Sequence, residues 1–410
     1  MLRAIALSYR EAFAGLRRPV WFLAVASLVN RAGTMVIPFL ALYLTEERGF
    51  TTSGAGQVLA VYGVGGMVAS LLGGWLCDRF DPRGVMTGSL ILTGLGFVAL
   101  GQMESRPAIF ITILLLSIAG ETFRPANAAA LTRASDPAER AKSFALYRLA
   151  INLGMTLGPM VGGFLALRSY QWLFLVDGTT CVLAAGLLFL IPGEPAPEGD
   201  AEAAAAAPAR SPWRDRPLLL LLFFLFLLNT VTFQFLSTYP LSLRDLYGFS
   251  EDRIGLTLAI NTFVIVVFEM VLVHWVSRYD PLRVTGLGAF LFCTGFALLP
   301  LGRGFAYVAF TVVIWTVGEM LTFPVVAGAI ANRADAGSVG RTMGLMNLAF
   351  ATAFVIAPLA GTWVYEHLGP RVLWYGCGAM GVFVWAGFEA LAAAGRRPGP
   401  SPTPPAPHEA

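Results

Sequence analysis

The stretch LCDRFDPRGVM at residues 76–86 returns 199 positions later as WVSRYDPLRVT at residues 275–285. Each copy places an arginine, an aromatic residue and an Asp-Pro pair between two apolar runs. The same offset pairs residues of later segments, namely Pro125 with Pro324, Lys142 with Arg341, Pro159 with Pro358, and Gly162 with Gly361. An offset kept over so much of the chain predicts two related halves that follow one another in parallel.

The composition indicates that most of the chain is solvated by lipid. Of the 410 residues, 56% are hydrophobic and only 13% are charged, whereas about a quarter are charged in a typical soluble domain. Apolar runs long enough to cross a hydrocarbon core of about 30 Å recur along the whole length. We expect spans near 19–44, 54–77, 84–103, 107–130, 142–167 and 170–191, and then near 217–242, 252–276, 282–302, 304–330, 341–365 and 371–394. The predicted fold class is therefore an all-α integral membrane protein, with twelve transmembrane helices in two pseudo-symmetric six-helix bundles.

Two polar segments predict the domain boundaries. Residues 192–216 and 396–410 are rich in proline, and the first of them also in alanine and charge, with too little apolar surface to form a packed core. We therefore expect an N-terminal bundle over residues 1–191, a cytoplasmic linker, a C-terminal bundle over residues 217–395, and a disordered tail.

The basic residues predict the orientation in the membrane. Most of the 28 Lys and Arg residues fall in cytoplasmic segments if both termini are cytoplasmic, and the opposite assignment would reverse this bias. We therefore expect a multi-pass protein of the cell membrane, the inner membrane in a bacterium, with both ends inside.

Several other functions are disfavoured by the composition. A net charge of +3 without a basic cluster argues against nucleic acid as a partner. The cysteines lack CxxC spacing, so we expect no disulfide framework, no metal and no cofactor; they are Cys77, Cys181, Cys293 and Cys377. The three histidines are not spaced for catalysis and no P-loop motif is present, so neither an enzyme nor an ATP-driven pump is expected.

The first repeat copy resembles a loop of a known family. GGWLCDRFDPR at residues 73–83 resembles the pattern G-x-L-x-D-R-x-G-R-[KR] between spans two and three of major facilitator superfamily transporters. The positions that match directly are Gly74, Leu76, Asp78 and Arg79. Asp81 stands where the pattern has glycine and Pro82 where it has arginine, whereas Arg83 keeps a basic residue. The resemblance implies a transporter of two six-helix halves, in which this loop stabilises one conformation.

Span five carries a second resemblance. GMTLGPMVGG at residues 154–163 fits the pattern G-x-x-x-G-P-x-x-G-G, which this superfamily associates with antiporters. Its fixed positions are Gly154, Gly158, Pro159, Gly162 and Gly163. Small residues four apart let another helix approach closely, and proline permits a bend. The alternative is a glycine packing seam of the kind common in membrane bundles.

Two further resemblances are partial. GETFRPANAAA at residues 120–130 is similar to the R-x-x-Q-G-x-G-A-A pattern of proton-coupled members through Arg124, with Asn127 in place of glutamine and Ala128 in place of glycine. FALYRLAINLG at residues 144–154 resembles span five of proton-coupled peptide symporters. The E-x-x-E-R pattern that those symporters carry in span one is absent, which counts against that subfamily.

Polar side chains inside the spans are the candidate site residues, because an ionisable group in lipid is costly unless it is paired or hydrated. They are Asn30, Arg31, Glu121, Arg124, Arg148, Asn152, Glu269 and Glu319. Residues three or four apart share a helix face, which predicts that Glu121 lies beside Arg124 and Arg148 beside Asn152. The resemblance implies that spans one, four, seven and ten line the cavity. We therefore expect Arg31, Glu121, Arg124 and Glu319 to meet around one water-filled space.

Glu121 is the candidate proton carrier. A carboxylate that gains and loses contact with Arg124 or Arg148 would load and release a proton during transport. Alternatively, Glu121 and Arg124 form a permanent buried pair, and Glu269 simply pairs with an arginine of a neighbouring helix. Asp177 begins an apolar run and is expected near the outer surface.

Together these features favour a secondary active transporter. The leading hypothesis is a proton-coupled antiporter that exports hydrophobic or amphipathic small molecules by alternating access, and the family resemblance implies a monomer. The alternatives are a proton-coupled symporter that imports peptides, sugars or organic acids, and a transporter of lysophospholipids on the same fold.

Overall fold

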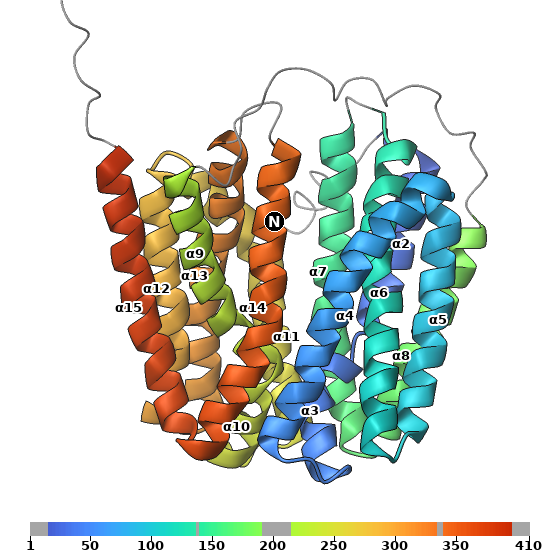
Figure 1. Cartoon of the computed structure of the whole chain (residues 1–410), viewed down its shortest axis with the longest axis horizontal. Helices are drawn as coiled ribbons and strands as arrows, with labels where there is room; N and C mark the ends of the chain where they lie inside the picture. Colours follow the sequence, from blue (N-terminus) through green and yellow to red (C-terminus); the bar gives the residue numbers. More distant parts are fainter. Residues whose placement is uncertain (1–14, 137–138, 191–214, 334–338, 396–410) are drawn as a thin grey trace, which may run out of the picture.

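The computed structural model describes residues 15–136, 139–190, 215–333 and 339–395, and these contain helices and no strand. Twelve of the helical segments are long and apolar enough to cross a membrane, in agreement with the predicted fold class. They form two bundles that stand side by side (Figure 1). The predicted tail, and all of the predicted linker except its last two residues, lie outside the described part of the chain.

Each bundle contributes six spans in chain order. The N-terminal half consists of α2 (Arg18–Ala32), α3 (Val36–Glu46), α4 (Thr52–Arg79), α5 (Pro82–Gln102), α6 (Arg106–Ala134), α7 (Arg140–Ala166) and α8 (Gln171–Phe189). The C-terminal half consists of α9 (Arg216–Thr232), the 3-10 turn η2 (Phe233–Leu236), α10 (Thr238–Tyr247), α11 (Glu251–Val276), α12 (Pro281–Ala297), η3 (Leu299–Leu301), α13 (Phe305–Arg333), α14 (Val339–His367) and α15 (Pro370–Gly395).

The repeated Asp-Pro pair begins the third span of each half. Asp81 and Asp280 are the N-cap residues of α5 and α12, and Pro82 and Pro281 follow at the first helical position. Proline is suited to that position because its missing N–H would have no partner in the helix anyway, and aspartate favours the positive end of the helix dipole. The repeat at 76–86 is therefore the joint between two spans, which must turn sharply in both halves.

The first span of each half is broken, although the sequence predicted continuous spans over 19–44 and 217–242. In the N-terminal half, α2 ends at Ala32 and α3 begins at Val36. In the C-terminal half, η2 separates α9 from α10. A break leaves backbone N–H and C=O groups unpaired inside the bundle, so side chains must satisfy them.

The two halves meet along two equivalent seams, α4 with α14 and α7 with α11. At the first seam, Gly56 lies against the backbone oxygen of Pro358; at the second, Gly255 lies against that of Pro159 and against Gly163. The equivalent residues are again 199 positions apart, so the seams are related by the symmetry of the halves. A side chain at either glycine would collide with backbone, which explains why these positions are glycine.

The two ends of the molecule differ. We call the end at which α8 finishes and α9 starts the linker end, and the end that carries α10 and the last turn of α3 the gate end (Figure 1). Helices α4 and α14 touch where Gly63 lies against Phe354, but Gly74 and Gly344, nearer the linker end, have no facing atoms within 4 Å of an added side chain. The seam is therefore closed toward the gate end and open toward the linker end.

Candidate functional site

A cavity of about 480 Å³ lies between the halves. Its walls come from α4, α6, η2 and α14, and it is lined by Tyr62, Gly63, Gly66, Ser70, Glu121, Arg124, Pro125, Phe233, Leu236, Asn347, Phe350, Ala351 and Phe354. Four aromatic rings make the surface largely apolar, and the lining holds one acid and one base. We call it the central cavity. Such a mixture suits a molecule with an apolar body and few polar groups.

The charged pair of this cavity is the one expected from the spacing. Arg124 Nε lies 3.0 Å from Glu121 Oε2, and the hydroxyl of Tyr62 donates to Glu121 Oε1 at 3.1 Å. The Arg124 side chain is 56% exposed and that of Glu121 only 20%. The arginine thus reaches into the cavity, while the carboxylate lies between it and the interior of the N-terminal half.

A smaller cavity of about 40 Å³ lies behind Glu121, inside the N-terminal half. We call it the inner cavity; its polar lining consists of Asn30, Arg31, Thr34, Tyr62, Thr93, Glu121, Asp177 and Cys181. Asn30 Nδ2 lies 3.5 Å from Cys181 Sγ. Glu121 and Tyr62 line both cavities, so they form the partition between them. Of these two cavities, Arg31 lines the inner one and Arg124 the central one, so the expectation that both face one space is wrong.

Asp177 is not near the outer surface, contrary to the expectation from the sequence. Its residue is 2% exposed in the middle of α8, and Oδ2 accepts hydrogen bonds from the backbone N–H groups of Met35 at 3.2 Å and Val36 at 3.1 Å. These are the N–H groups that the break between α2 and α3 leaves unpaired. The aspartate is buried because it caps a helix that begins inside the membrane.

Arg148 and Glu269 form an ion pair across the α7–α11 seam and so join the two halves. Glu269 is buried and belongs to α11. This is the pairing with an arginine of another helix that the sequence left open, and it places Arg148 with Glu269 instead of with Glu121. Asn152 lies one turn further along α7, partly buried, where its carbonyl accepts a hydrogen bond from Thr156.

Glu319 lies in the C-terminal half, away from Glu121. Its Oε2 accepts a hydrogen bond from Asn261 Nδ2 at 2.8 Å, between α13 and α11. Neither the central nor the inner cavity is lined by it. The structure therefore does not bring Glu319 into one space with Glu121 and Arg124, because its side chain turns toward the neighbouring helix of its own half.

The glycines of the span-five motif pack against the broken first span. Side chains added at Gly154 and Gly158 would meet Arg31 and its carbonyl, and one at Gly162 would meet Met35. Spaced four apart, these glycines form one face of α7 on which the end of α2 and the start of α3 rest. The motif thus makes room for the break.

The remaining motif glycine serves the seam between the halves. Gly163 lies against the backbone of Glu251 in α11, beside the contact between Pro159 and Gly255. Pro159 is inside α7 and lacks a donor there, which permits local bending of the helix. One short motif therefore touches both the broken span and the other half.

The loop at residues 73–83 joins α4 to α5 and packs against α6, where a side chain at Gly73 would meet Pro125. Arg79 lies over the ring of Trp75, with 4.5 Å from the guanidinium carbon to the ring centre. Asp81 pairs with Arg133 at 3.8 Å, and both side chains are exposed. The side chain of Asp78 lies outside the described part, and Arg83 is in the first turn of α5.

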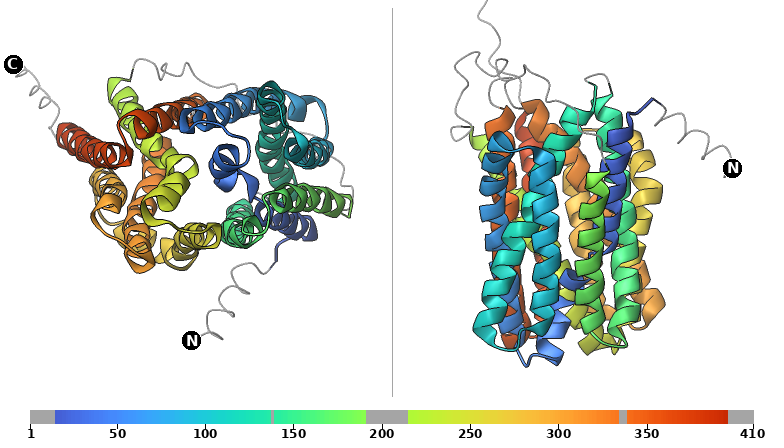
Figure 2. Two further views of the ribbon diagram at one scale, coloured as in Figure 1. Left: turned by 90° about the horizontal axis from the view of Figure 1, so that it is seen from below. Right: turned by 90° about the vertical axis from the view of Figure 1, so that its right-hand side faces the viewer.

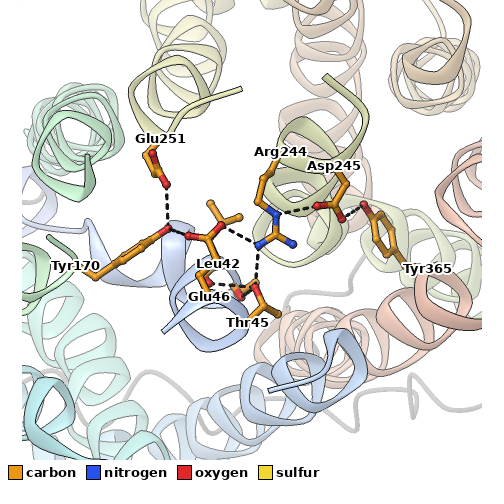
Figure 3. Close-up of polar contacts among 9 residues, drawn as sticks. Leu42, Thr45, Glu46, Tyr170, Arg244, Asp245, Glu251 and Tyr365 are labelled. Atoms are coloured by element: carbon orange, nitrogen blue, oxygen red, sulfur yellow. Dashed lines mark hydrogen bonds and ion pairs between the residues drawn. The ribbon is translucent and has the colours of Figure 1, made fainter. Parts of the chain in front are cut away.

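The gate end is closed by polar contacts between the halves (Figure 3). Arg244 of α10 donates through Nη1 to Glu46 Oε1 at 2.9 Å and to Thr45 Oγ1 at 3.0 Å, and through Nε to Asp245 Oδ1 at 2.8 Å. The hydroxyl of Tyr365 in α14 donates to Asp245 Oδ2 at 2.8 Å. A single arginine thus joins acids of both halves. We call these residues, with Tyr170 and Glu251, the gate network.

Tyr170 extends the gate network within the N-terminal half and toward α11. Its hydroxyl lies 2.8 Å from Glu46 Oε2 and 3.3 Å from Glu251 Oε1. Burial and the hydrogen bond to Glu46 raise the pKa of the Tyr170 hydroxyl, which stays neutral. Burial opposes the charge of Arg244, but the hydrogen bonds to Asp245 and Glu46 outweigh it and raise the pKa of its guanidinium. The network therefore keeps its arginine charged.

The sequence analysis missed the gate network, although the repeat contained a signal. Thr45 and Arg244, which touch, are separated by the repeat offset of 199, and so are Glu46 and Asp245. Residues that contact their own counterparts lie on the symmetry axis between the halves. Seen from below the view of Figure 1, α3 lies inside the ring formed by the other helices (Figure 2).

Comparison with known proteins fits this arrangement of two related halves. The sequence profile of the Major Facilitator Superfamily matches residues 21–351, and a second match covers residues 235–410. The chain belongs to the Major Facilitator Superfamily. Members of this superfamily are transporters, so the chain is a membrane transporter and not an enzyme.

Similar members of the superfamily include proteins of several bacteria. An uncharacterised MFS-type transporter of Bacillus subtilis, YqjV, is 27% identical over 355 residues, which cover 83% of this chain and 85% of that protein. A Na⁺, Li⁺, K⁺/H⁺ antiporter of Planococcus maritimus is 23% identical, with 85% and 88% covered. The multidrug resistance protein MdtH of Aeromonas salmonicida is 21% identical, with 88% and 92% covered.

Solved structures of other transporters share the fold. A POT family transporter in complex with 5-aminolevulinic acid has a TM-score of 0.79 and 16% identity, covering 94% of this chain and 98% of that one. The nucleoside transporter NupG has a TM-score of 0.78 and 14% identity, with 92% and 99% covered.

Proposed function

We propose that this transporter is a proton-coupled antiporter that exports hydrophobic or amphipathic small molecules by alternating access. The observation that carries the proposal is the central cavity, in which aromatic walls surround the pair of Glu121 and Arg124. We place the protein as a monomer in the bacterial inner membrane, with both termini and the linker end in the cytoplasm, as the distribution of basic residues favours.

The walls of the central cavity favour an amphipathic or cationic substrate. The ring of Phe233 contacts those of Phe350 and Phe354, with centroid distances of 4.8 Å and 4.5 Å. Aromatic faces bind apolar groups and attract cations. Glu121 is the acid of the cavity, so a lipophilic cation is able to replace Arg124 beside it.

Glu121 is also the group through which the substrate and a proton compete. Its carboxylate is held by Arg124 and Tyr62 in the empty cavity. Protonation of Glu121 removes the charge that attracts a cation, and a bound cation disfavours protonation. Mutually exclusive binding of this kind is what couples the two movements in an antiporter.

The closed gate network and the divergence of α4 and α14 supply a conformation for loading. In this conformation, substrate reaches the central cavity from the linker end, while contacts of Arg244 with Glu46 keep the gate end shut. Export requires the opposite arrangement, in which the gate network breaks and α4 packs onto α14 near Gly74. The names of two relatives, a cation/H⁺ antiporter and a multidrug resistance protein, add support for antiport and for efflux.

Dye accumulation in efflux-deficient bacterial cells tests the proposal. Cells that express the wild type are expected to accumulate less of at least one dye from a panel of lipophilic cations, and an uncoupler is expected to abolish the difference. Cells that express Glu121→Gln should accumulate as much dye as cells without the transporter. Glu389→Gln is the matched control, because Glu389 pairs with Arg283 far from the cavity, and it should behave as the wild type.

Two outcomes would contradict the proposal. Unchanged accumulation of every dye, with membrane expression confirmed, would favour import or a lipid substrate. Equal export by the wild type and Glu121→Gln would mean that Glu121 and Arg124 form a permanent pair with a structural role.

A further inference from the structure

A second buried carboxylate lies behind Glu121 and has no part in the function proposed above. Asp177 lines the inner cavity together with Glu121, and it accepts both hydrogen bonds from the start of α3. A carboxylate at the N-terminus of a helix is stabilised by the helix dipole as well as by these bonds. The charge of Asp177 therefore fixes where α3 begins.

Helix α3 connects this aspartate with the gate network. It is only 11 residues long, from Val36 to Glu46, and is almost entirely buried. Glu46 at its end binds Arg244 of the other half. A short helix moves as one body, so release of its first turn from Asp177 also loosens Glu46 at the gate.

We propose that Asp177 is a second proton-binding site, that its protonation decides whether α3 is held at the closed gate, and that its proton leaves through Glu121. This rests on the proposed antiport for its role in transport, but not for its chemistry. The ionised carboxylate accepts two charge-assisted hydrogen bonds and holds α3 in the position described here. The protonated form accepts weaker ones, and α3 is released.

The proton transfer needs no further reactant. The carboxylic acid of Asp177 gives up its proton to water in the inner cavity, and the carboxylate of Glu121 accepts a proton from that water. A volume of about 40 Å³ is sufficient, because a buried water needs about 10–15 Å³. Glu121 also lines the central cavity, so the proton leaves toward the linker end. The proton thus moves from Asp177 toward the linker end, opposite to an exported substrate.

The groups around Asp177 favour it as the carboxylate that takes the proton. The ionisable groups that line the same cavity are Arg31 of α2, Tyr62 of α4, Glu121 of α6 and Cys181 of α8. Helix α5 contributes Leu90, Thr93 and Phe97, α3 contributes Ile37, and α7 contributes no lining residue. Arg31 is the positive charge of this lining, and Arg124 binds Glu121 from the side of the central cavity. While Arg124 holds the Glu121 carboxylate, Asp177 is the carboxylate that is free to take the proton.

A pH titration of the gate in the absence of substrate tests this proposal. Spin labels on Glu47→Cys and Leu246→Cys, both exposed at the gate end, report the distance between α3 and α10; the four native cysteines are buried. In the wild type, lowering the pH should raise the ratio of open to closed gate about tenfold. In Asp177→Asn, which keeps an oxygen for the two N–H groups but has no charge, the ratio should be high at every pH.

Two controls keep the outcome interpretable. Asp136→Asn, at an exposed position, should titrate as the wild type. Glu121→Gln should keep a pH-dependent gate, because Asp177 remains in it, and this holds even if Asp177→Asn does not fold. A titration that disappears in Glu121→Gln, or one that persists in Asp177→Asn, would overturn the proposal. Because no substrate is present, a failed dye assay leaves this test intact.

Discussion

The broken first spans of the two halves are held in different ways. In the N-terminal half, the charged Asp177 reaches over from α8 and caps the start of α3. In the C-terminal half, the neutral Gln234 lies in the break itself, donates to the carbonyl of Ala357 in α14 at 2.9 Å, and accepts from the hydroxyl of Thr238 at 2.8 Å. One architecture thus carries a titratable anchor in one half and a permanent one in the other. We expect the N-terminal break to respond to pH and the C-terminal break to act as a fixed support.

The largest loss of stability is expected from a side chain added at Gly158, where α7 packs tightly against the break between α2 and α3. Gly158→Leu would drive a side chain into the backbone of Arg31 and Thr34, so the folded protein should be destabilised by about 1–3 kcal/mol or more and transport should be lost. Thermal unfolding in detergent measures the loss. Gly186→Leu, which meets no atom within 4 Å, is the control. Equal stability of the two variants would mean that the packing at the break is not tight.

Removing the neutral anchor should cost stability at every pH. Gln234→Leu deletes hydrogen bonds to Ala357 and Thr238 and leaves a buried carbonyl without its donor, a loss of about 2 kcal/mol. Denaturation at pH 5.5 and pH 8 should show the same decrease, because no charge is involved. A decrease at only one pH would contradict the contrast drawn between the halves.

Making the C-terminal anchor acidic sharpens the comparison. In Gln234→Glu, the side chain is able to donate to the carbonyl of Ala357 only when it is protonated, and the ionised form places a charge against that oxygen. The protonated folded state is favoured over the ionised one, so stability should fall as the pH rises. Denaturation of Gln234→Leu and Gln234→Glu at pH 5.5 and pH 8 measures this pH dependence of the stability. Stability that rises with pH would show that another group compensates the charge.

The smallest effect is expected at the gate network, which is partly exposed. Arg244→Gln removes one ion pair between the halves, and Glu46 and Arg244 are each about 30% exposed, so the closed gate should lose only about 1 kcal/mol. The spin-label pair at positions 47 and 246 measures the change in the ratio of open to closed gate. Arg244→Lys should lie between this variant and the wild type, because lysine keeps the charge but not the fork of donors. An unchanged ratio of open to closed gate in Arg244→Gln would mean that other contacts along the seams close the gate.

The sequence predicted the fold and the pair of Glu121 with Arg124, because both depend on patterns that can be read directly along the chain. The length of the apolar runs gives the spans, the offset gives the two halves, and the spacing of three brings Glu121 to Arg124. The pairing of Arg148 with Glu269 joins residues 121 positions apart and depends on how the halves dock. No local pattern contains that information.

Asp177 was misplaced for a different reason. A single aspartate beside an apolar run is usually at a membrane surface, where water solvates it. Here the break after Ala32 supplies two N–H groups in the interior, and these replace the water. Because the break belongs to another span, the environment of Asp177 cannot be predicted from its own neighbours in the chain.

The contact between Thr45 and Arg244 has a consequence for how such a gate arises. On the symmetry axis, each residue faces its own counterpart, so two identical halves would place threonine against threonine or arginine against arginine. Two arginines in contact would repel, so the hydrogen bond from Arg244 to Thr45 requires different residues in the two halves. The contact of Arg244 with Thr45 on the axis is therefore available only to a chain whose halves have diverged at this position, whereas the neighbouring ion pair with Glu46 would also be possible between identical halves.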